Sequence, residues 1–204
     1  MKASGFDAVS WYYDVLARLV FQGSIPKAQT EFLHRLPPSN ILVMGGGTGW
    51  ILPEIFKAQP QAVVWYVEVS QKMIAKAQAQ PSRGMTHFIH GTEDDIPSGQ
   101  LFDAVITPFF LDVFTLAAMD AVIRKIDAAV HPSGLWIVSE FQNKKTWHRV
   151  MLWIMYRFFR FAASIDAAHL ADWEESLQRA GWVRKESKEF YAGFIDAAVF
   201  QRNP

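Results

Sequence analysis

The chain has 204 residues, of which 50% are hydrophobic and 20% are charged, enough to bury the core of one domain. Lysine plus arginine and aspartate plus glutamate each number 20, so no net charge attracts a nucleic acid, and we expect no such partner. Because the chain has no cysteine, it forms no disulfide and no thiolate metal site, which fits a cytoplasmic location.

Residues 1–40 are expected to form a helical cap on the core that follows. Their apolar stretches are interrupted by Asp7, Asp14 and Arg18, which does not fit a signal peptide. The most apolar stretch of the chain, MLWIMYRFFRFAA, contains two arginines and falls short of the ~18 uninterrupted apolar residues of a spanning helix. We therefore expect no transmembrane segment.

From about residue 40, short apolar runs alternate with longer helical patterns, which is typical of a parallel sheet with crossover helices. The runs are apolar nearly throughout, as expected for strands covered on both faces. Residues 115–130 show helical spacing, and His131-Pro132-Ser133-Gly134 is expected to end that helix. The five predicted strands are ILVMG from Ile41, VVWYVE from Val63, MTHFIH from Met85, FDAVIT from Phe102 and LWIVSEF from Leu135.

The C-terminal part predicts a helix followed by two strands. Leu170, Trp173, Leu177 and Ala180 form one helical stripe that ends at Gly181. The segments WVRKESKEF and GFIDAAVFQR then read as strands joined by a short turn. Because no crossover helix fits between them, they should pair antiparallel. The sequence thus predicts an α/β fold whose mainly parallel sheet ends in an antiparallel hairpin.

A glycine cluster directly after the first strand is the sharpest local signal for a ligand site. Glycines let the backbone turn tightly and approach a ligand, and the helix that follows offers free N–H groups at its start. An ordinary tight turn is the alternative. Glu68 favours a nucleotide-like ligand, since a carboxylate at the end of the second strand accepts hydrogen bonds from ribose hydroxyls in such folds. The cluster consists of Gly45, Gly46, Gly47, Thr48 and Gly49.

The spacing of the glycines selects among nucleotides. Trp50 stands where the dinucleotide fingerprint G-x-G-x-x-G requires its third glycine, and no phosphate-loop lysine follows. Gly45, Gly47 and Gly49 instead spell G-x-G-x-G. With this spacing the sequence resembles the class I S-adenosylmethionine-dependent methyltransferases over most of its length. The resemblance implies a Rossmann-like, seven-stranded sheet of order 3-2-1-4-5-7-6 with helices on both faces.

The resemblance also implies which residues hold S-adenosylmethionine and its product S-adenosylhomocysteine. The backbone of residues 45–49 would pass under the methionyl part, and Glu68, followed by Val69, would hold the ribose. The segment FIHGTEDDIP would border the adenine through Thr92 and Glu93. Two further cofactor contacts are expected, from Thr107 at the end of the fourth strand and from Tyr13 in the N-terminal segment.

Two departures from the family pattern keep alternatives open. Val43 stands where the family often has an acidic residue, and Thr92 replaces the adenine-side aspartate. The alternatives are a non-catalytic relative that binds S-adenosylmethionine and, with less support, an NAD(P)-dependent reductase. Within the family, the chain looks most like the methyltransferases of ubiquinone and menaquinone biosynthesis. That likeness implies a small, apolar or aromatic acceptor methylated by an SN2 displacement.

The acceptor should meet the carboxyl ends of the fourth and fifth strands. We expect it to meet residues 107–112 and residues 140–142 there. The candidates for catalysis are Asp112, His148 and Tyr156, although Asp112 is also placed to cap the helix that begins near Thr115. The six histidines lack metal-binding spacing, so no metal site is expected.

The last feature is an aromatic helix over residues 144–163 that is apolar nearly all round. A lid over the substrate, a homodimer contact and a membrane-surface foothold are alternative covers for its second face, besides burial by Trp11, Tyr12 and Phe21. We therefore divide the chain into the cap, a cofactor-binding core at 41–142, a lid-like insertion at 143–168 and a final part at 169–204. The stripe expected to face the sheet comprises Trp147, Val150, Met151, Ile154, Met155, Phe158 and Ala162.

Overall fold

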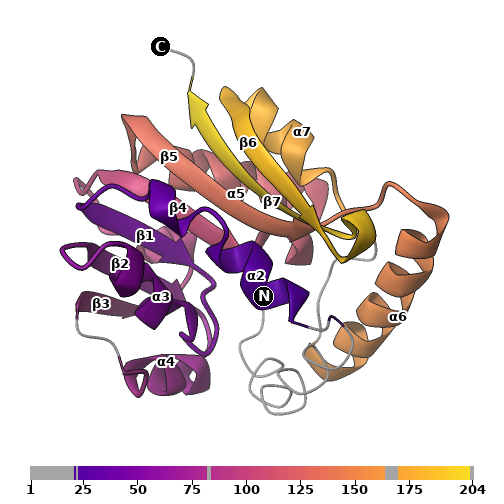
Figure 1. Ribbon diagram of the computed structural model, residues 1–204, viewed down its shortest axis with the longest axis horizontal. Helices are drawn as coiled ribbons and strands as arrows, with labels where there is room; N and C mark the ends of the chain where they lie inside the picture. The colour runs from indigo at the N-terminus through magenta and orange to yellow at the C-terminus, as the bar shows by residue number, and fades with distance from the viewer. Residues whose placement is uncertain (1–20, 22, 82–83, 164–169, 203–204) are drawn as a thin grey trace.

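One seven-stranded sheet of order β3-β2-β1-β4-β5-β7-β6 organises the computed structural model (Figure 1). The structure describes residues 21, 23–81, 84–163 and 170–202. The pairs from β3 to β5 are parallel, whereas β7 runs antiparallel to both β5 and β6. The predicted strand order and C-terminal hairpin are confirmed. The strands are β1 Asn40–Met44, β2 Val63–Glu68, β3 Met85–His90, β4 Phe102–Pro108, β5 Val130–Phe141, β6 Trp182–Phe190 and β7 Ile195–Arg202.

Helices cover both faces of this sheet (Figure 1). The α-helices are α2 Ser24–Thr30, α3 Ile51–Ala58, α4 Gln71–Gln78, α5 Leu116–Ala128, α6 Thr146–Ala163 and α7 Trp173–Arg179. Short 3₁₀ turns are η1 Leu33–Arg35, η2 Glu93–Asp95, η3 Leu111–Val113 and η4 Tyr191–Gly193.

Two hydrophobic clusters, one on each face, explain why the central strands are apolar throughout. Ile41 and Val43 of β1 pack in the cluster that includes residues of α2 and α3, whereas Leu42 and Met44 pack with residues of α5 and α7. All four side chains are buried. Alternate residues of a strand point to opposite faces, so a strand covered on both sides has no polar face. The buried Val43 shows that the position at which an acid is common serves packing here.

The fifth strand begins earlier than the sequence predicts. We expect the segment His131-Pro132-Ser133-Gly134 to separate helix from strand, but β5 already starts at Val130. Phe102 of β4 pairs with Val130 and Ala104 pairs with Leu135, so β5 contains extra residues between these pairs. The extra residues at 131–133 are exposed and bulge from the sheet. The helix does end before this segment, at Ala128, as predicted. Only the predicted start of the strand at Leu135 is wrong, because turn-forming residues here form a bulge within the strand.

The face that α6 turns toward the domain is also not the one we expect. Its buried residues are His148, Leu152 and Tyr156, which lie at i, i+4 and i+8 and therefore share one side of the helix. Val150 and Ile154 of the expected stripe are exposed instead. Both sides of α6 are apolar, so periodicity alone had no power to choose between them. Within the described part of the chain, no helix is both long and apolar enough to cross a membrane.

A buried ion pair joins the C-terminal hairpin to α7 and supports a stability prediction. The Arg184 guanidinium donates to the fully buried Asp196 carboxylate at 2.7 Å and to Glu174 at 2.7 Å. We expect Arg184→Met to lower the free energy of unfolding by about 3 kcal/mol, because Asp196 stays buried without its cation. The matched control Arg179→Met removes surface ion pairs with Asp120 and Glu175 and a hydrogen bond to Ser176 but leaves no buried charge without its partner, so it should cost less than about 1 kcal/mol. Urea denaturation measures both, and equal losses would contradict the prediction.

Candidate functional site

The loop between β1 and α3 adopts a backbone conformation that residues with side chains rarely adopt. Gly45, Gly47 and Gly49 have φ angles of 65°, 64° and 75°, in the left-handed region that favours glycine. The Gly45 N–H donates to the Val67 carbonyl at 2.9 Å, which holds the start of the loop against β2. The Gln80 side-chain amide donates to the Thr48 carbonyl at 3.0 Å. The loop therefore has a fixed shape at the carboxyl end of β1.

Only one of the loop glycines faces open space. A Cβ added at Gly45 would meet the Phe110 ring at 2.6 Å, and one at Gly49 would meet Ala77 at 2.5 Å. A Cβ at Gly46 would clash with the Tyr66 ring. Among the residues that the structure describes, no heavy atom lies within 4 Å of a Cβ at Gly47. Three of the glycines are thus required by packing, whereas Gly47 leaves its outer side accessible to a ligand.

Glu68, at the end of β2, points its carboxylate at this loop. Its Oε2 accepts a hydrogen bond from the Gly47 N–H at 3.0 Å, and its Oε1 accepts one from the Ser70 N–H at 2.9 Å. Burial raises the pKa of the Glu68 carboxyl, and the backbone donors at Ser70 and Gly47 oppose that shift. A carboxylate offers about four acceptor positions, so the backbone donors at Ser70, Gly47 and Val69 leave acceptor capacity for a ligand.

Tyr66 is a second support for the loop, and the sequence analysis missed it. Its hydroxyl donates to the Gly47 carbonyl at 2.9 Å, so Gly47 is held through its N–H by Glu68 and through its carbonyl by Tyr66. Burial, and then the charge of Glu68, raises the pKa of Tyr66 well above its ordinary value. The signal was available, because Tyr66 precedes Glu68 by two residues in a strand and so shares its face.

The residues expected near the adenine lie at the carboxyl ends of β2 and β3. The Val69 carbonyl is 3.0 Å from Nε2 of His90, the last residue of β3. The hydroxyl of Thr92 caps the 3₁₀ turn η2, and Glu93 pairs with Lys125 of α5 at 3.4 Å. Both Thr92 and Glu93 therefore already have structural partners at this edge of the sheet.

Thr107 has a buried structural role. Its hydroxyl accepts a hydrogen bond from the Trp136 indole at 3.0 Å, and its side chain is fully buried between β4 and β5. A contact from Thr107 to a ligand would therefore use its main chain. Tyr13, the remaining expected cofactor contact, lies outside the described residues, as do Trp11 and Tyr12.

Two buried carboxyl groups face each other at the ends of β4 and β5. Glu140 is fully buried, and its Oε1 accepts hydrogen bonds from the N–H groups of Phe110 at 2.8 Å and Leu111 at 2.6 Å. Its Oε2, like Oδ1 of Asp112, is buried without a hydrogen-bond partner among the described residues. Burial raises the pKa of Asp112 to about 7. Burial, followed by the charge of Asp112, raises the pKa of Glu140 well above its ordinary range.

The helix-capping alternative for Asp112 is wrong. Asp112 lies within η3, and Thr115 is the N-cap residue of α5. The Asp112 carboxyl makes no bond to the first turn of α5, because η3 turns it inward toward Glu140. The sequence analysis placed Glu140 near the acceptor but did not count it as a candidate. An acidic residue ending an apolar strand was the signal for it.

The structure brings Tyr156 to this pair but does not bring His148. The Tyr156 hydroxyl donates to the Asp112 carbonyl at 3.0 Å. His148 is buried, and the centre of its ring lies 5.2 Å from that of Phe194. Its Nδ1 accepts a hydrogen bond from the Lys144 N–H. Burial, and then the charge of Lys145, lowers the pKa of His148. Eight residues of helix place the two side chains roughly 12 Å apart along α6, so they do not converge.

Aromatic rings and a strained backbone border the carboxyl pair. Phe109, directly after β4, has a φ of 53°, an unfavourable conformation for a residue with a side chain. Its N–H donates to the Ser139 carbonyl at 2.7 Å, and its ring lies 4.7 Å from that of Phe141. Strain of this kind persists where the surroundings enforce it, often at functional sites. The carboxyl pair thus lies beside a mainly aromatic, apolar wall.

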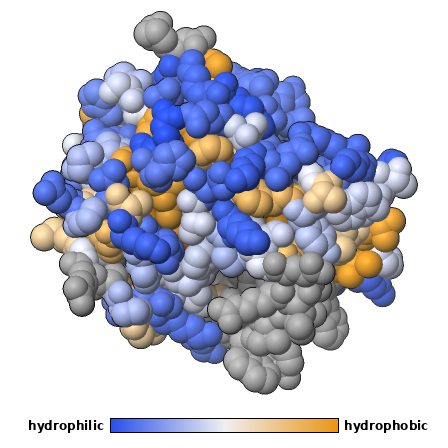
Figure 2. Space-filling view, viewed as in Figure 1, coloured by the Kyte–Doolittle hydropathy of each residue, from blue (hydrophilic) through white to orange (hydrophobic). Residues whose placement is uncertain are grey.

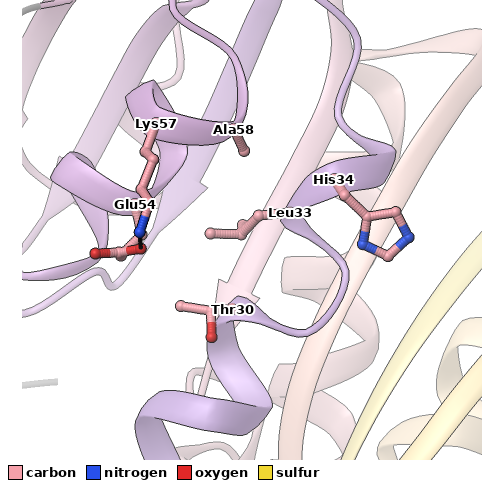
Figure 3. Close-up of a pocket in the computed structure, with 6 residues that line it drawn as sticks. All are labelled: Thr30, Leu33, His34, Glu54, Lys57 and Ala58. Atoms are coloured by element: carbon pink, nitrogen blue, oxygen red, sulfur yellow. Dashed lines mark ion pairs between the residues drawn. The ribbon is translucent and has the colours of Figure 1, made fainter.

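A surface depression of about 320 Å³ lies elsewhere (Figure 3). Its lining residues come from the end of α2, from η1 and from α3. One wall is the exposed ion pair between Lys57 and Glu54 at 3.7 Å. No predicted site residue borders it, so we assign it no role. Its lining residues are Thr30, Leu33, His34, Glu54, Lys57 and Ala58.

Among the residues that the structure describes, no cluster of three metal-ligating side chains occurs.

Comparison with known proteins gives a family match for the central part of the chain. Residues 41–134 match the family model described as a methyltransferase domain. A malonyl-[acyl-carrier protein] O-methyltransferase of Halalkalibacterium halodurans is 28% identical over 109 residues, which cover 51% of this chain. The match spans only 40% of that relative's length.

Solved structures extend the likeness to the whole chain. The complex of DhpI with S-adenosylhomocysteine has a TM-score of 0.71 at 18% identity, with 99% of this chain and 95% of that chain covered. Magnesium protoporphyrin IX methyltransferase of Synechocystis, also with bound S-adenosylhomocysteine, has a TM-score of 0.71 at 16% identity, covering 98% and 95%. Residues 41–134 therefore match a methyltransferase domain, and the fold of the chain is that of the class I methyltransferases.

Proposed function

We propose that the protein is an S-adenosylmethionine-dependent methyltransferase that acts on a small, apolar or aromatic acceptor. The observation that carries the proposal is the Glu68 carboxylate hydrogen-bonded to Gly47, the one loop glycine whose outer side is open. The two solved structures named above carry S-adenosylhomocysteine on the same fold. Their identity to this chain is low, so the cofactor is a proposal for this chain.

The donors and acceptors at the loop fit S-adenosylmethionine. The Glu68 carboxylate keeps acceptor capacity for a ribose hydroxyl, and the open side of Gly47 admits the methionyl part close to the backbone. When bound, the cofactor supplies an electrophilic methyl group on a positively charged sulfur. The chain's own task is to align the acceptor with that methyl group, and positioning of this kind supplies on the order of 7–11 kcal/mol.

On the acceptor side, Asp112 is our candidate for the base. A pKa of about 7 leaves this carboxyl poised to take a proton near neutral pH, and its Oδ1 has no protein partner among the described residues. Glu140 has a positioning role. It accepts hydrogen bonds from the N–H groups of Phe110 and Leu111 and so fixes the turn that carries Asp112. Tyr156 fixes the same turn from α6. Phe109 and Phe141 exclude water from an apolar acceptor.

A non-catalytic S-adenosylmethionine-binding protein is the second candidate, and the buried Val43 favours it, because no acid supports the loop from β1. Such a protein would bind S-adenosylhomocysteine but transfer no methyl group to a panel of phenolic, quinol and carboxylic acceptors. An NAD(P)-dependent reductase has less support, since Trp50 is the N-cap residue of α3 where a dinucleotide site needs glycine. The four-part division of the chain, the quinone-biosynthesis type of acceptor and a cytoplasmic location remain proposals.

Cofactor binding tests the role of Glu68. Glu68→Gln keeps the shape of the side chain but removes its charge and one acceptor oxygen, so we expect S-adenosylhomocysteine to bind roughly 5 to 150 times more weakly. Isothermal titration measures the affinity, with NADH as a second titrant that should not bind. Glu54→Gln, on the outer side of α3, is the matched control and should bind like the wild type. Unchanged affinity in Glu68→Gln would refute the ribose assignment.

The raised pKa of Asp112 predicts a pH dependence of stability. Between its ordinary 3.8 and about 7, the folded state holds a proton that the unfolded state has lost, so this group's stabilising contribution falls as pH rises through that window. Asp112→Asn does not titrate. Its stability relative to the wild type should therefore increase by about 2 kcal/mol between pH 5 and pH 8. Urea denaturation at both values checks this, with the exposed Asp94→Asn as control, and a constant difference for Asp112→Asn would contradict it.

A further inference from the structure

The outward face of α6 concentrates exposed hydrophobic side chains. Seven large hydrophobic residues are exposed among the described residues, and four of them lie on this helix. Figure 2 shows hydrophobic atoms at the right edge of the molecule, where Figure 1 places α6. The four, with their exposed fractions, are Trp147 at 37%, Val150 at 57%, Trp153 at 65% and Ile154 at 52%.

The charge of this segment is also one-sided. Residues 144–163 contain five lysines and arginines and no aspartate or glutamate, although the whole chain has 20 of each sign. Arg149 and Arg157 are exposed and form no ion pair among the described residues. The Arg157 guanidinium lies 5.9 Å from the centre of the Trp153 ring, so cation and indole share one surface. The protein is neutral, yet this helix presents a local positive and apolar surface.

The exposed face is not the face that covers the acceptor. His148, Leu152 and Tyr156 face the domain, and Tyr156 reaches Asp112. With 100° between successive residues, Val150, Trp153 and Arg157 lie on the opposite side of the helix. A lid function would therefore use the buried face and leave the exposed face without a partner.

We propose that α6 docks on an anionic lipid bilayer, lying in the plane of its surface. Tryptophan and aliphatic side chains flanked by arginine, without acids, are the composition of helices that bind at the headgroup boundary. A two-fold contact with a second copy would bring the arginines of the two helices together, with no acid in residues 144–163 to compensate. A negatively charged bilayer satisfies both the charge and the hydrophobic face. The proposal does not depend on methyl transfer.

Flotation of the full chain with phosphatidylcholine vesicles, with and without about 30% phosphatidylglycerol, tests this docking. The protein should float with the anionic vesicles and release at high salt. The double variant Trp153→Ser with Ile154→Ser should lower the partition coefficient at least about tenfold. Arg149→Gln with Arg157→Gln should lower it roughly fivefold for each arginine. All these positions are exposed, so circular dichroism should show unchanged melting.

Two controls separate docking from general stickiness and from the cofactor site. Leu101→Ser with Leu116→Ser removes two exposed hydrophobic residues elsewhere and should float like the wild type. Glu68→Gln should also float normally, so a failed cofactor assignment leaves this result intact. Failure to bind anionic vesicles, or an equal loss in the leucine control, would overturn the proposal. So would a dimer seen by light scattering that Ile154→Ser dissociates, or binding to RNA without binding to vesicles.

Discussion

The two-sided hold on Gly47 is the interaction on which the site depends. Glu68 accepts a hydrogen bond from the Gly47 N–H, and Tyr66 donates one to the Gly47 carbonyl. One residue of the glycine loop is therefore fixed by two side chains of the neighbouring strand. Both come from the same face of β2, which pairs with β1 in parallel register. The loop is thus preorganised by the sheet itself, and its open side is kept at the edge where ligands of such folds bind.

The same edge carries the second constraint, the pair of Asp112 and Glu140. Burying two carboxyls together is costly unless one holds a proton, and the raised pKa values of both express that cost. Glu140 offsets part of it by binding the backbone of the turn after β4. Helix α6 then closes the turn through Tyr156. The turn after β4 is therefore held by hydrogen bonds from two sides and carries a carboxyl whose pKa burial raises to about 7.

Helix α6 links this site to the surface of the molecule. Its inner face contacts the turn that carries Asp112, and its outer face presents Trp153, Ile154 and Arg157 to the surroundings. An apolar acceptor partitions into lipid, so a helix that touches both the site and a bilayer would shorten the acceptor's path through water. Hydrophobicity on both sides of α6, which made its orientation ambiguous in the sequence, is what such a position requires.

The sequence by itself determined where the central strands and the glycine loop lie, because strands covered on both faces are apolar throughout and positive φ angles favour glycine, whereas the strand order followed from the resemblance to a known family. It also placed Glu68 at the loop, since strand periodicity fixes where the second strand ends. Only the tertiary structure decided which face of α6 is buried, that Asp112 turns toward Glu140 instead of capping α5, and that residues 131–133 bulge from β5. These outcomes depend on contacts between segments distant in the chain, and local periodicity carries no information about such contacts.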